Sequence, residues 1–240
     1  MPEPAAKPAS SPPGPGLAER LEAALALLRA QARPDQLAAM ARFGLGGASR
    51  LGLSVPQMRA LGRRLGADHE LALALWDTGI PDAQIVASLL AQPARFTVAQ
   101  LNHWTRGMQA WDVCDQACLN AFRGSPLAWA RIPVWAAARE EFVRRAAFAL
   151  LAVLAVHDKR RPDADFAALL PLIAAAADDE RNFVRKAVNW ALRQIGKRSR
   201  TLLPQAIAVA EALRERPEKS ARWIAADALR ELRPRKADPA

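Results

Sequence analysis

The sequence predicts an all-α protein built as an array of similar helical units. It is 51% hydrophobic, contains no Tyr and only 12 Gly, and is dominated by Ala, Leu and Arg, which favour helices. No convincing strand alternation interrupts the helical spacing. Prolines separate the helical segments and mostly stand near the start of the next one, where the missing N–H is tolerated. These prolines are Pro34, Pro56, Pro81, Pro126, Pro133, Pro162, Pro204 and Pro217.

An internal repeat specifies this architecture further. The segment FVRRAA (142–147) returns 41 residues later as FVRKAV (183–188), and a weaker echo, ARWIA (221–225), places Arg222 37 residues after Arg185. A period near 40 built from helix pairs is typical of HEAT or armadillo-like solenoids. We therefore expect a helical-repeat solenoid in which the second helices of the pairs line a concave face.

The domain organisation follows from composition. Residues 1–16 carry six prolines and little that could be buried, which predicts a disordered Pro-rich tail. Apolar residues recur at helical spacing from Leu17 onward, so the first amphipathic helix is expected there. We predict one repeat domain over residues 17–235 and a short tail over 236–240.

The charge balance indicates a polyanionic partner. The chain has 34 Lys and Arg against 24 Asp and Glu, a formal charge of +10, and residues 181–200 contain seven cations and no acid. This predicts a basic concave face that binds DNA, although a solvated face on a basic protein is the alternative. No apolar stretch reaches the roughly 18–20 residues of a membrane span, and no signal-peptide core is visible. We expect a cytoplasmic protein with no membrane partner.

The sequence lacks the motifs that are typical of metal sites, cofactor sites and catalytic nucleophiles. The three histidines lie far apart and none has ligand spacing to Cys114 or Cys118, so we expect no metal and no cofactor. The glycine-rich segment FGLGGASRLG (43–52) lacks the Lys-Ser/Thr of a phosphate loop and is expected to connect two helices. Both cysteines are expected to be reduced, and Cys114 is expected to be a buried structural thiol.

An aromatic and carboxylate constellation remains. In WDVCD (111–115), Trp111 and Asp115 are four residues apart and share a helix face, whereas Asp112 points about 100° away. In the later basic helix, Lys186, Trp190 and Arg193 share a face by the same spacing. Packing in the core or at its rim is the ordinary role of a tryptophan in a solenoid, and it is expected for Trp76, Trp104, Trp129 and Trp135.

These residues resemble a known family, the AlkD-like DNA alkylation repair glycosylases, which are built from HEAT-like repeats. The resemblance extends from about Met40 to Leu232. It departs from the family at the two cysteines and at the insertion-like stretch 123–135. The matching segments are MARF (40–43), VPQMRAL (55–61), LWD (75–77), WDVCD (111–115), VRRAA (143–147) and FVRKAVNWALRQIGK (183–197).

The resemblance implies a site. Trp111 and Trp190 would be its aromatic walls, Asp115 the catalytic carboxylate between them, and Phe43 another aromatic near the cleft. Arg145 and Arg193 would hold the DNA backbone near the lesion. The basic face is expected to add further DNA contacts from Arg144, Arg185, Lys186, Lys197 and Arg222.

The resulting expectation is a monomeric DNA repair glycosylase, nucleoid-associated when bound to DNA and needing no obligate protein partner. Its expected substrate is double-stranded DNA containing cationic alkylated purines, 3-methyladenine and 7-methylguanine, excised by N-glycosidic bond hydrolysis without base flipping. Two alternatives stay open from the residues. One is a non-catalytic HEAT-like DNA-binding protein of the same family, and the other is a solenoid whose basic groove takes an acidic peptide.

Overall fold

The computed structural model describes residues 15–46 and 48–236. The predicted tails, 1–16 and 236–240, lie outside this range apart from Pro15, Gly16 and Lys236. Within the described residues there are helices, turns and loops but no strand, which confirms the all-α prediction. None of the helices is long and apolar enough to cross a membrane within the part of the chain described.

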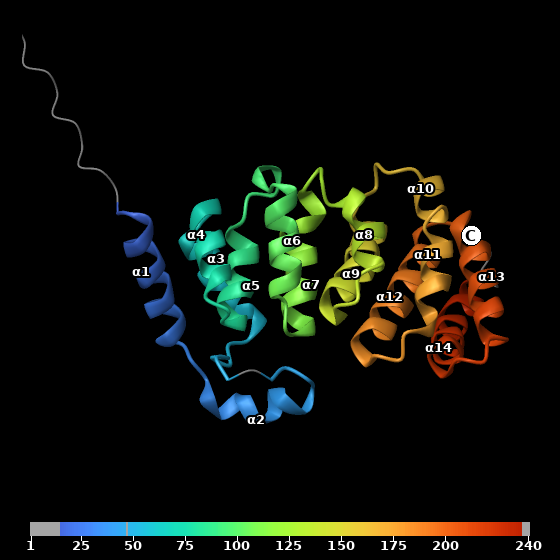
Figure 1. Cartoon of the computed structure of the whole chain (residues 1–240), viewed down its shortest axis with the longest axis horizontal. Helices are drawn as coiled ribbons and strands as arrows, with labels where there is room; N and C mark the ends of the chain where they lie inside the picture. Colours follow the sequence, from blue (N-terminus) through green and yellow to red (C-terminus); the bar gives the residue numbers. More distant parts are fainter. Residues whose placement is uncertain (1–14, 47, 237–240) are drawn as a thin grey trace, which may run out of the picture.

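The α-helices are arrayed along the long axis from α1 at one end to α13 and α14 at the other, with α2 set below the array (Figure 1). They are α1 (Leu17–Arg29), α2 (Pro34–Arg42), α3 (Val55–Leu65), α4 (His69–Asp77), α5 (Pro81–Leu90), α6 (Val98–Gly107), α7 (Trp111–Asn120), α8 (Ile132–Ala136), α9 (Glu141–His157), α10 (Asp163–Ala167), α11 (Leu170–Ala175), α12 (Asn182–Arg198), α13 (Leu202–Arg214) and α14 (Lys219–Lys236). Short 3-10 turns are η1 (Pro93–Arg95), η2 (Phe122–Gly124), η3 (Trp129–Arg131) and η4 (Ala176–Asp178).

The sequence repeat is a structural repeat. Helices α9 and α12 are both 17 residues long, begin at equivalent positions of the repeat, and pack against each other along the solenoid. The equivalent residues Phe142 and Phe183 lie one unit apart, with stacked rings whose centroids are 5.7 Å apart. The echo at 221–225 falls in α14, which packs against α12 and α13. The solenoid prediction is confirmed.

The core runs the length of the array. Helix α9 is buried from Arg145 to Ala155, so it forms the centre of the molecule, whereas α12 buries only the stripe that faces its neighbours. Trp76 and Trp104 stack in the core with ring centroids 4.0 Å apart, and Trp135 is also buried, as expected. Trp129 is half-buried beneath the guanidinium of Arg161.

Helix starts are encoded locally. Ser54 and Gln57 form a capping box at α3, as do Thr97 and Gln100 at α6, and the Asp68 carboxylate accepts from the Leu71 amide at α4. Side-chain caps of this kind satisfy amides that have no partner within the helix, and each typically contributes about 1 kcal/mol.

Helix α2 departs from the stack. It has no buried residue and lies beneath the other helices in Figure 1, bordering the face that carries the site. The segment that follows α2 passes through Gly52, which has a φ of 86°, a value that favours glycine. Gly52 also lies so close to the Arg33 carbonyl that there is no room for a Cβ. The buried Asp82 carboxylate accepts from the Leu51 and Leu53 amides, both at 2.8 Å. The glycine-rich segment therefore connects two helices, as predicted.

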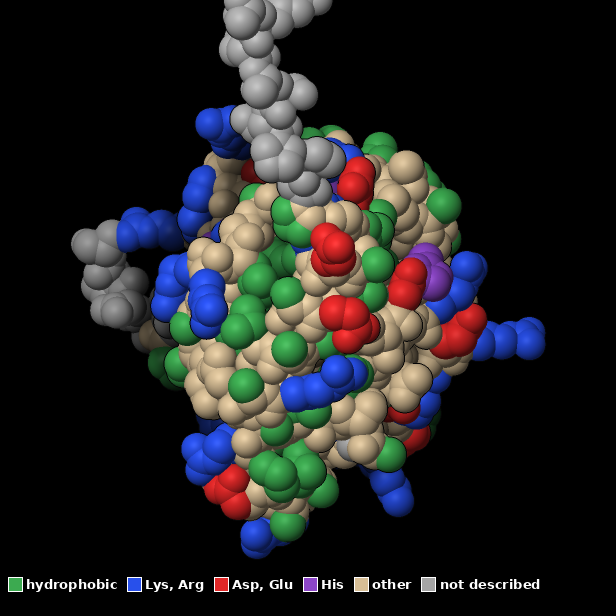
Figure 2. All heavy atoms as spheres, turned by 90° about the vertical axis from the view of Figure 1, so that its left-hand side faces the viewer, with side chains coloured by type: hydrophobic (Ala, Val, Ile, Leu, Met, Phe, Trp, Pro, Cys, Tyr) green, Lys and Arg blue, Asp and Glu red, His purple; other side chains and the backbone are tan. Residues whose placement is uncertain are grey.

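The surface carries charges of both signs. Figure 2 looks onto the α1 end of the molecule and shows hydrophobic side chains scattered among charged ones, with Lys and Arg projecting mainly at the periphery. On this face the hydrophobic side chains are interrupted by charged and polar ones. The net positive charge of the chain is therefore not gathered into one patch at this end.

Candidate active site

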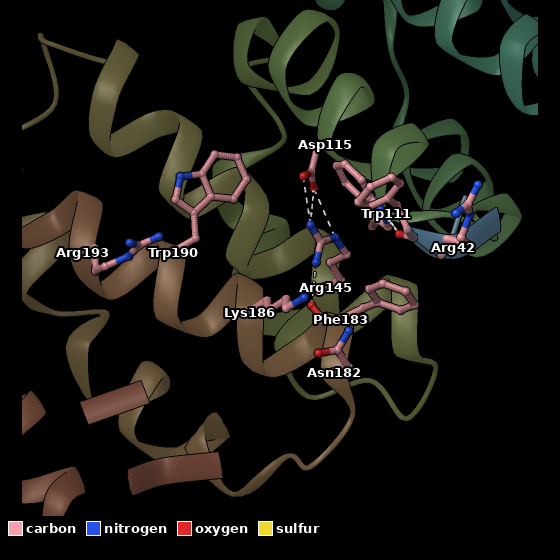
Figure 3. Close-up of a pocket in the computed structure, with 11 residues that line it drawn as sticks. Arg42, Trp111, Asp115, Arg145, Asn182, Phe183, Lys186, Trp190 and Arg193 are labelled. Atoms are coloured by element: carbon pink, nitrogen blue, oxygen red, sulfur yellow. Dashed lines mark hydrogen bonds and ion pairs between the residues drawn. The ribbon is translucent and has the colours of Figure 1, made fainter. Parts of the chain in front are cut away.

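A cleft of about 670 Å³ lies where α7, α9 and α12 meet the end of α2. Each of these elements contributes side chains to its lining (Figure 3). The lining residues are Arg42, Phe43, Gly44, Trp111, Asp115, Arg145, Asn182, Phe183, Lys186, Trp190 and Arg193. Seven of the eleven predicted site residues, spread from Phe43 to Arg193 in the sequence, therefore line one cavity.

An ion pair between Asp115 and Arg145 forms the base of the cleft. The Arg145 Nη2 donates to both carboxylate oxygens at 2.9 Å, and its Nε donates to Oδ1 at 3.1 Å. The remaining terminal nitrogen, Nη1, donates to the Phe183 carbonyl at 2.6 Å. The side chain of Arg145 is 6% exposed and that of Asp115 is 20% exposed. Arg145 is therefore fixed by α7 and α12 together, while the carboxylate keeps access to the cleft.

Burial and charge act in opposite directions on this pair. Burial raises the pKa of the Asp115 carboxyl above its ordinary value, and the charge and hydrogen bonds of Arg145 oppose that rise. Burial also disfavours the charge on Arg145, but Asp115 outweighs it and raises the pKa of the guanidinium. Arg145 is therefore the group that favours the ionised form of Asp115.

Two indoles flank the ion pair. Trp111 and Trp190 stand on opposite sides of Asp115 and Arg145 (Figure 3). The Trp111 Nε1 donates to the Phe43 carbonyl at 2.9 Å, which ties α7 to the end of α2. Trp111, Asp115 and Trp190 also border a second, mostly apolar hollow of about 500 Å³. A group held between the two indoles would thus contact the Asp115 carboxylate and lie between the cleft and the second hollow.

The neighbouring carboxylate, Asp112, serves a different purpose. It points away from the cleft, as the helical spacing predicted, and accepts from Arg50 at 2.8 and 2.9 Å. Arg50 lies in the segment between α2 and α3, so the pair fastens that segment to the start of α7 beside Trp111. No feature of the sequence predicts that Arg50 and Asp112, 62 positions apart, form an ion pair.

The predicted DNA-binding residues fall into two groups. Phe43, Lys186 and Arg193 line the cleft together with Arg145, and the side chain of Phe43 is among the most exposed apolar groups described. Arg144 instead donates to the buried Asp179 at 3.0 Å, and Arg222 donates to the Pro217 carbonyl. These two side chains are already engaged outside the cleft.

A ladder of side chains joins α12 to α14. Asn189 donates to Asp227 at 2.6 Å, Arg193 contacts Glu231 at 2.9 Å and Asp227 at 3.4 Å, and Lys197 contacts Glu231 at 2.6 Å. At the start of the ladder, the Arg185 guanidinium lies 4.9 Å from the centre of the Trp223 ring. The positive charge of α12 is thus partly neutralised by the acidic side chains of α14.

Sequence reasoning missed four cleft residues, Arg42, Gly44, Asn182 and Phe183. Phe183 stands in the repeated motif, which was the only available signal, while Arg42 and Asn182 gave none. Gly44 has a φ of 74°, and a Cβ there would approach the Phe183 ring to 2.7 Å, so a glycine is required where the connecting segment crosses that ring.

The two cysteines lie close enough to the Asp115–Arg145 pair to interact with its charges, but they do not line the cleft. Cys114 and Cys118 are fully buried, and burial raises the pKa of the Cys118 thiol well above its ordinary value, which makes it a poor nucleophile. Among the residues that the structure describes, no three His, Cys, Asp or Glu side chains are grouped so as to hold a metal ion.

Comparison with known proteins shows the fold and the family of the chain. The chain is similar to a solved structure reported as "A new family of proteins related to the HEAT-like repeat DNA glycosylases with affinity for branched DNA structures", with a TM-score of 0.73 and 16% identity over 88% of this chain and 95% of that one. No curated protein matches the sequence. Residues 24–232 match the family model described as DNA alkylation repair enzyme. The resemblance found in the sequence is confirmed, and the chain belongs to the DNA alkylation repair enzyme family.

Proposed function

We propose that the protein is a DNA glycosylase that hydrolyses the N-glycosidic bond of positively charged alkylated purines in duplex DNA. The observation that carries this proposal is the placement of Asp115. Its carboxylate is oriented by Arg145 at the base of a cleft and stands between two indoles. The proposed substrates are 3-methyladenine and 7-methylguanine nucleotides.

The charges explain how such a site would act. In these lesions the base is cationic, so it leaves with the bonding electron pair as a neutral molecule and needs little acid catalysis. Positive charge then develops on the deoxyribose. The Asp115 carboxylate would stabilise this oxocarbenium-like state and orient a water that adds to C1′ and releases a proton to solvent. A preorganised electrostatic contact of this kind is typically worth roughly 3–4 kcal/mol, or about 100–1,000-fold in rate.

The indoles would hold the lesion nucleotide. Cation–π attraction to Trp111 and Trp190 would contribute on the order of 0.5–2 kcal/mol, depending on desolvation. The cleft is bordered by exposed side chains, Phe43 and Lys186, and so opens to solvent. Base flipping into a closed pocket is the usual route for this chemistry. We infer that a base stacked in the duplex is attacked from this open cleft without flipping.

Duplex DNA would be held mainly by phosphate contacts. Lys186 lines the cleft and Arg185 lies beside it through its contact with Asn182. Arg193 also lines the cleft but, like Arg144, Lys197 and Arg222, would have to exchange its present partner for phosphate. Such binding is steeply salt dependent, because each contact releases counterions, and reads little sequence. A single molecule suffices to hold one duplex, so we propose a monomer that acts on cytoplasmic, nucleoid DNA.

A second candidate function is non-catalytic DNA binding. It is favoured by the similarity to the solved structure whose description names affinity for branched DNA. The two candidates share the fold and the basic cleft, and they differ in whether a base is released. They also differ in the preferred DNA, which would be a junction for the second candidate and an alkylated duplex for the first.

Release of free base from three matched duplexes separates the candidates. One duplex carries 7-methylguanine, one carries 3-methyladenine, and the third carries the neutral lesion uracil at the same position. We expect release of both cationic bases and none of uracil. Duplex binding without any base release would overturn the glycosylase proposal in favour of the second candidate. Equal release of uracil would contradict the charge-based mechanism.

A further inference from the structure

An exposed tryptophan lies outside the cleft at the beginning of α14. Trp223 keeps 36% of its surface exposed, and the guanidinium of Arg185 lies over its ring. Arg185 also donates to Asn182 Oδ1 at 3.4 Å, and Asn182 lines the cleft. The Arg185–Trp223 pair therefore adjoins the wall of the candidate active site.

This pair differs from the rest of the α12–α14 ladder. Arg193 and Lys197 each meet a carboxylate of α14, whereas Arg185 meets an indole at the equivalent position. The Nε of Arg185, like that of Arg193, is buried and has no hydrogen-bond partner in the structure. An aromatic ring does not neutralise a guanidinium as a carboxylate does. The positive charge of Arg185 is therefore retained beside a partly exposed indole.

The surroundings are also basic. Lys186 is exposed on the cleft side, and Lys219 and Arg222 are exposed beside Trp223 on the first turns of α14. The nearby Glu218 is bound by Arg216 at 2.9 Å. Exposed aromatic rings among cations are the elements with which proteins bind single-stranded nucleic acid, because every base has a π face and every nucleotide a phosphate.

We propose that Trp223 and Arg185 form a stacking platform for an unpaired DNA base, so that the protein binds a single-stranded segment adjoining the duplex in the cleft. This rests on the DNA binding in the proposed function and does not require catalysis. A base inside a duplex has both faces covered by its neighbours. Phosphate binding alone would not use an indole. The indole therefore indicates an unpaired base rather than more duplex.

The position of the platform suits a strand that leaves the cleft. Arg185 precedes Trp190 by five residues on α12, which is roughly 7–8 Å along the helix axis. Successive nucleotides rise about 3.4 Å per strand. A strand following α12 would therefore reach the platform about two nucleotides from the lesion position.

The test compares two labelled DNA probes by fluorescence anisotropy. One is a blunt duplex, and the other is the same duplex with a short single-stranded extension of thymidines. We expect wild type to bind the extended probe more tightly. Trp223→Leu keeps apolar bulk without an aromatic face and should remove most of that gain, about five- to 150-fold for one stacked base, while leaving blunt-duplex binding unchanged.

Further variants separate stacking from packing. Trp223→Phe retains a π face and should keep most of the preference. Trp223→Leu should leave the salt dependence of binding unchanged, whereas Arg185→Gln should flatten it by about 0.7 in the logarithmic slope for one lost single-strand phosphate contact. Trp129→Leu is the matched control, because Trp129 also carries an arginine over its ring but does not line the cleft.

Three outcomes would overturn the proposal. They are a wild type without preference for the extended probe, an equal loss on both probes in Trp223→Leu, or an equal loss in Trp223→Phe and Trp223→Leu. The outcome is independent of catalysis. If wild type releases no base but Trp223 still determines the preference for the extension, the glycosylase proposal fails and the platform stands.

Discussion

Removing one partner of the Arg50–Asp112 ion pair should destabilise the protein strongly. The Arg50 side chain is 1% exposed and that of Asp112 is 11% exposed, and two hydrogen bonds of 2.8 and 2.9 Å join them. In Asp112→Ala the guanidinium stays buried without its counterion, and its Nε already has no partner. Breaking a buried pair in this way typically costs about 3–5 kcal/mol.

This cost can be measured by thermal and urea unfolding followed by circular dichroism. For a chain of this size, 1 kcal/mol corresponds to about 2–4 °C in Tm, so Asp112→Ala should lower Tm by roughly 6–20 °C. The matched control is Asp35→Ala. Asp35 makes the same two-pronged contact with Arg33, but in solvent, where water replaces the lost partner, and Tm should hardly change.

A double variant identifies the cause. Arg50→Met with Asp112→Leu removes both charges and fills the space, so it should recover most of the stability lost in Asp112→Ala. A single variant within about 1 kcal/mol of wild type would refute the reasoning, and so would a double variant in which the two losses simply add.

Three further predictions concern the site. Burial raises the pKa of Asp115, and the proposed reaction needs its ionised form, so the rate of base release should fall on acidification already above pH 3.8, the ordinary pKa of Asp. Arg145→Met removes the charge that opposes this rise and should move the acid side of the pH–rate profile to still higher pH. An unchanged profile in Arg145→Met would contradict this. Gly44→Ala should lower Tm through its positive φ and its contact with Phe183, whereas Gly46→Ala, with open space around it, should not. Glu231→Gln should release Lys197 and leave Arg193 with Asp227 alone, which should tighten duplex binding and steepen its salt slope by up to about 0.9 per new phosphate contact. Fluorescence anisotropy compares this variant with Glu215→Gln, an exposed control, and equal affinities of the two variants would show that these cations do not reach DNA.

Helical spacing and the repeat predicted most of the fold and the centre of the site. The repeat of 41 residues corresponds to the equivalent helices α9 and α12, and Phe142 stacks on Phe183 one unit later. Spacing within single helices placed Trp111 with Asp115, and Lys186 with Trp190 and Arg193. Both groups line one cleft because the two helices pack on α9 with those faces toward it.

Contacts between repeats could not be predicted, because periodicity gives the faces of one helix and not the partner that each face meets. Arg144 and Arg145 are neighbours in sequence, yet they point about 100° apart on α9, one to Asp179 and the other to Asp115. The acids of α14 that meet Arg193 and Lys197 lie 34–38 residues farther along the chain. Arg50 reaches Asp112 because the chain runs back from α2, outside the array of helices, past the start of α7.

In the proposed function, the Asp115 carboxylate catalyses release of a cationic base. The most direct test is single-turnover release of 7-methylguanine from duplex DNA by wild type, Asp115→Asn and the charge-matched control Asp77→Asn, whose carboxylate lies on the surface with His103. Duplex affinity is measured on the same samples. We expect Asp115→Asn to lose about 100–1,000-fold in rate but still to bind duplex, and Asp77→Asn to match wild type. Release by Asp115→Asn at the wild-type rate would contradict the proposed function.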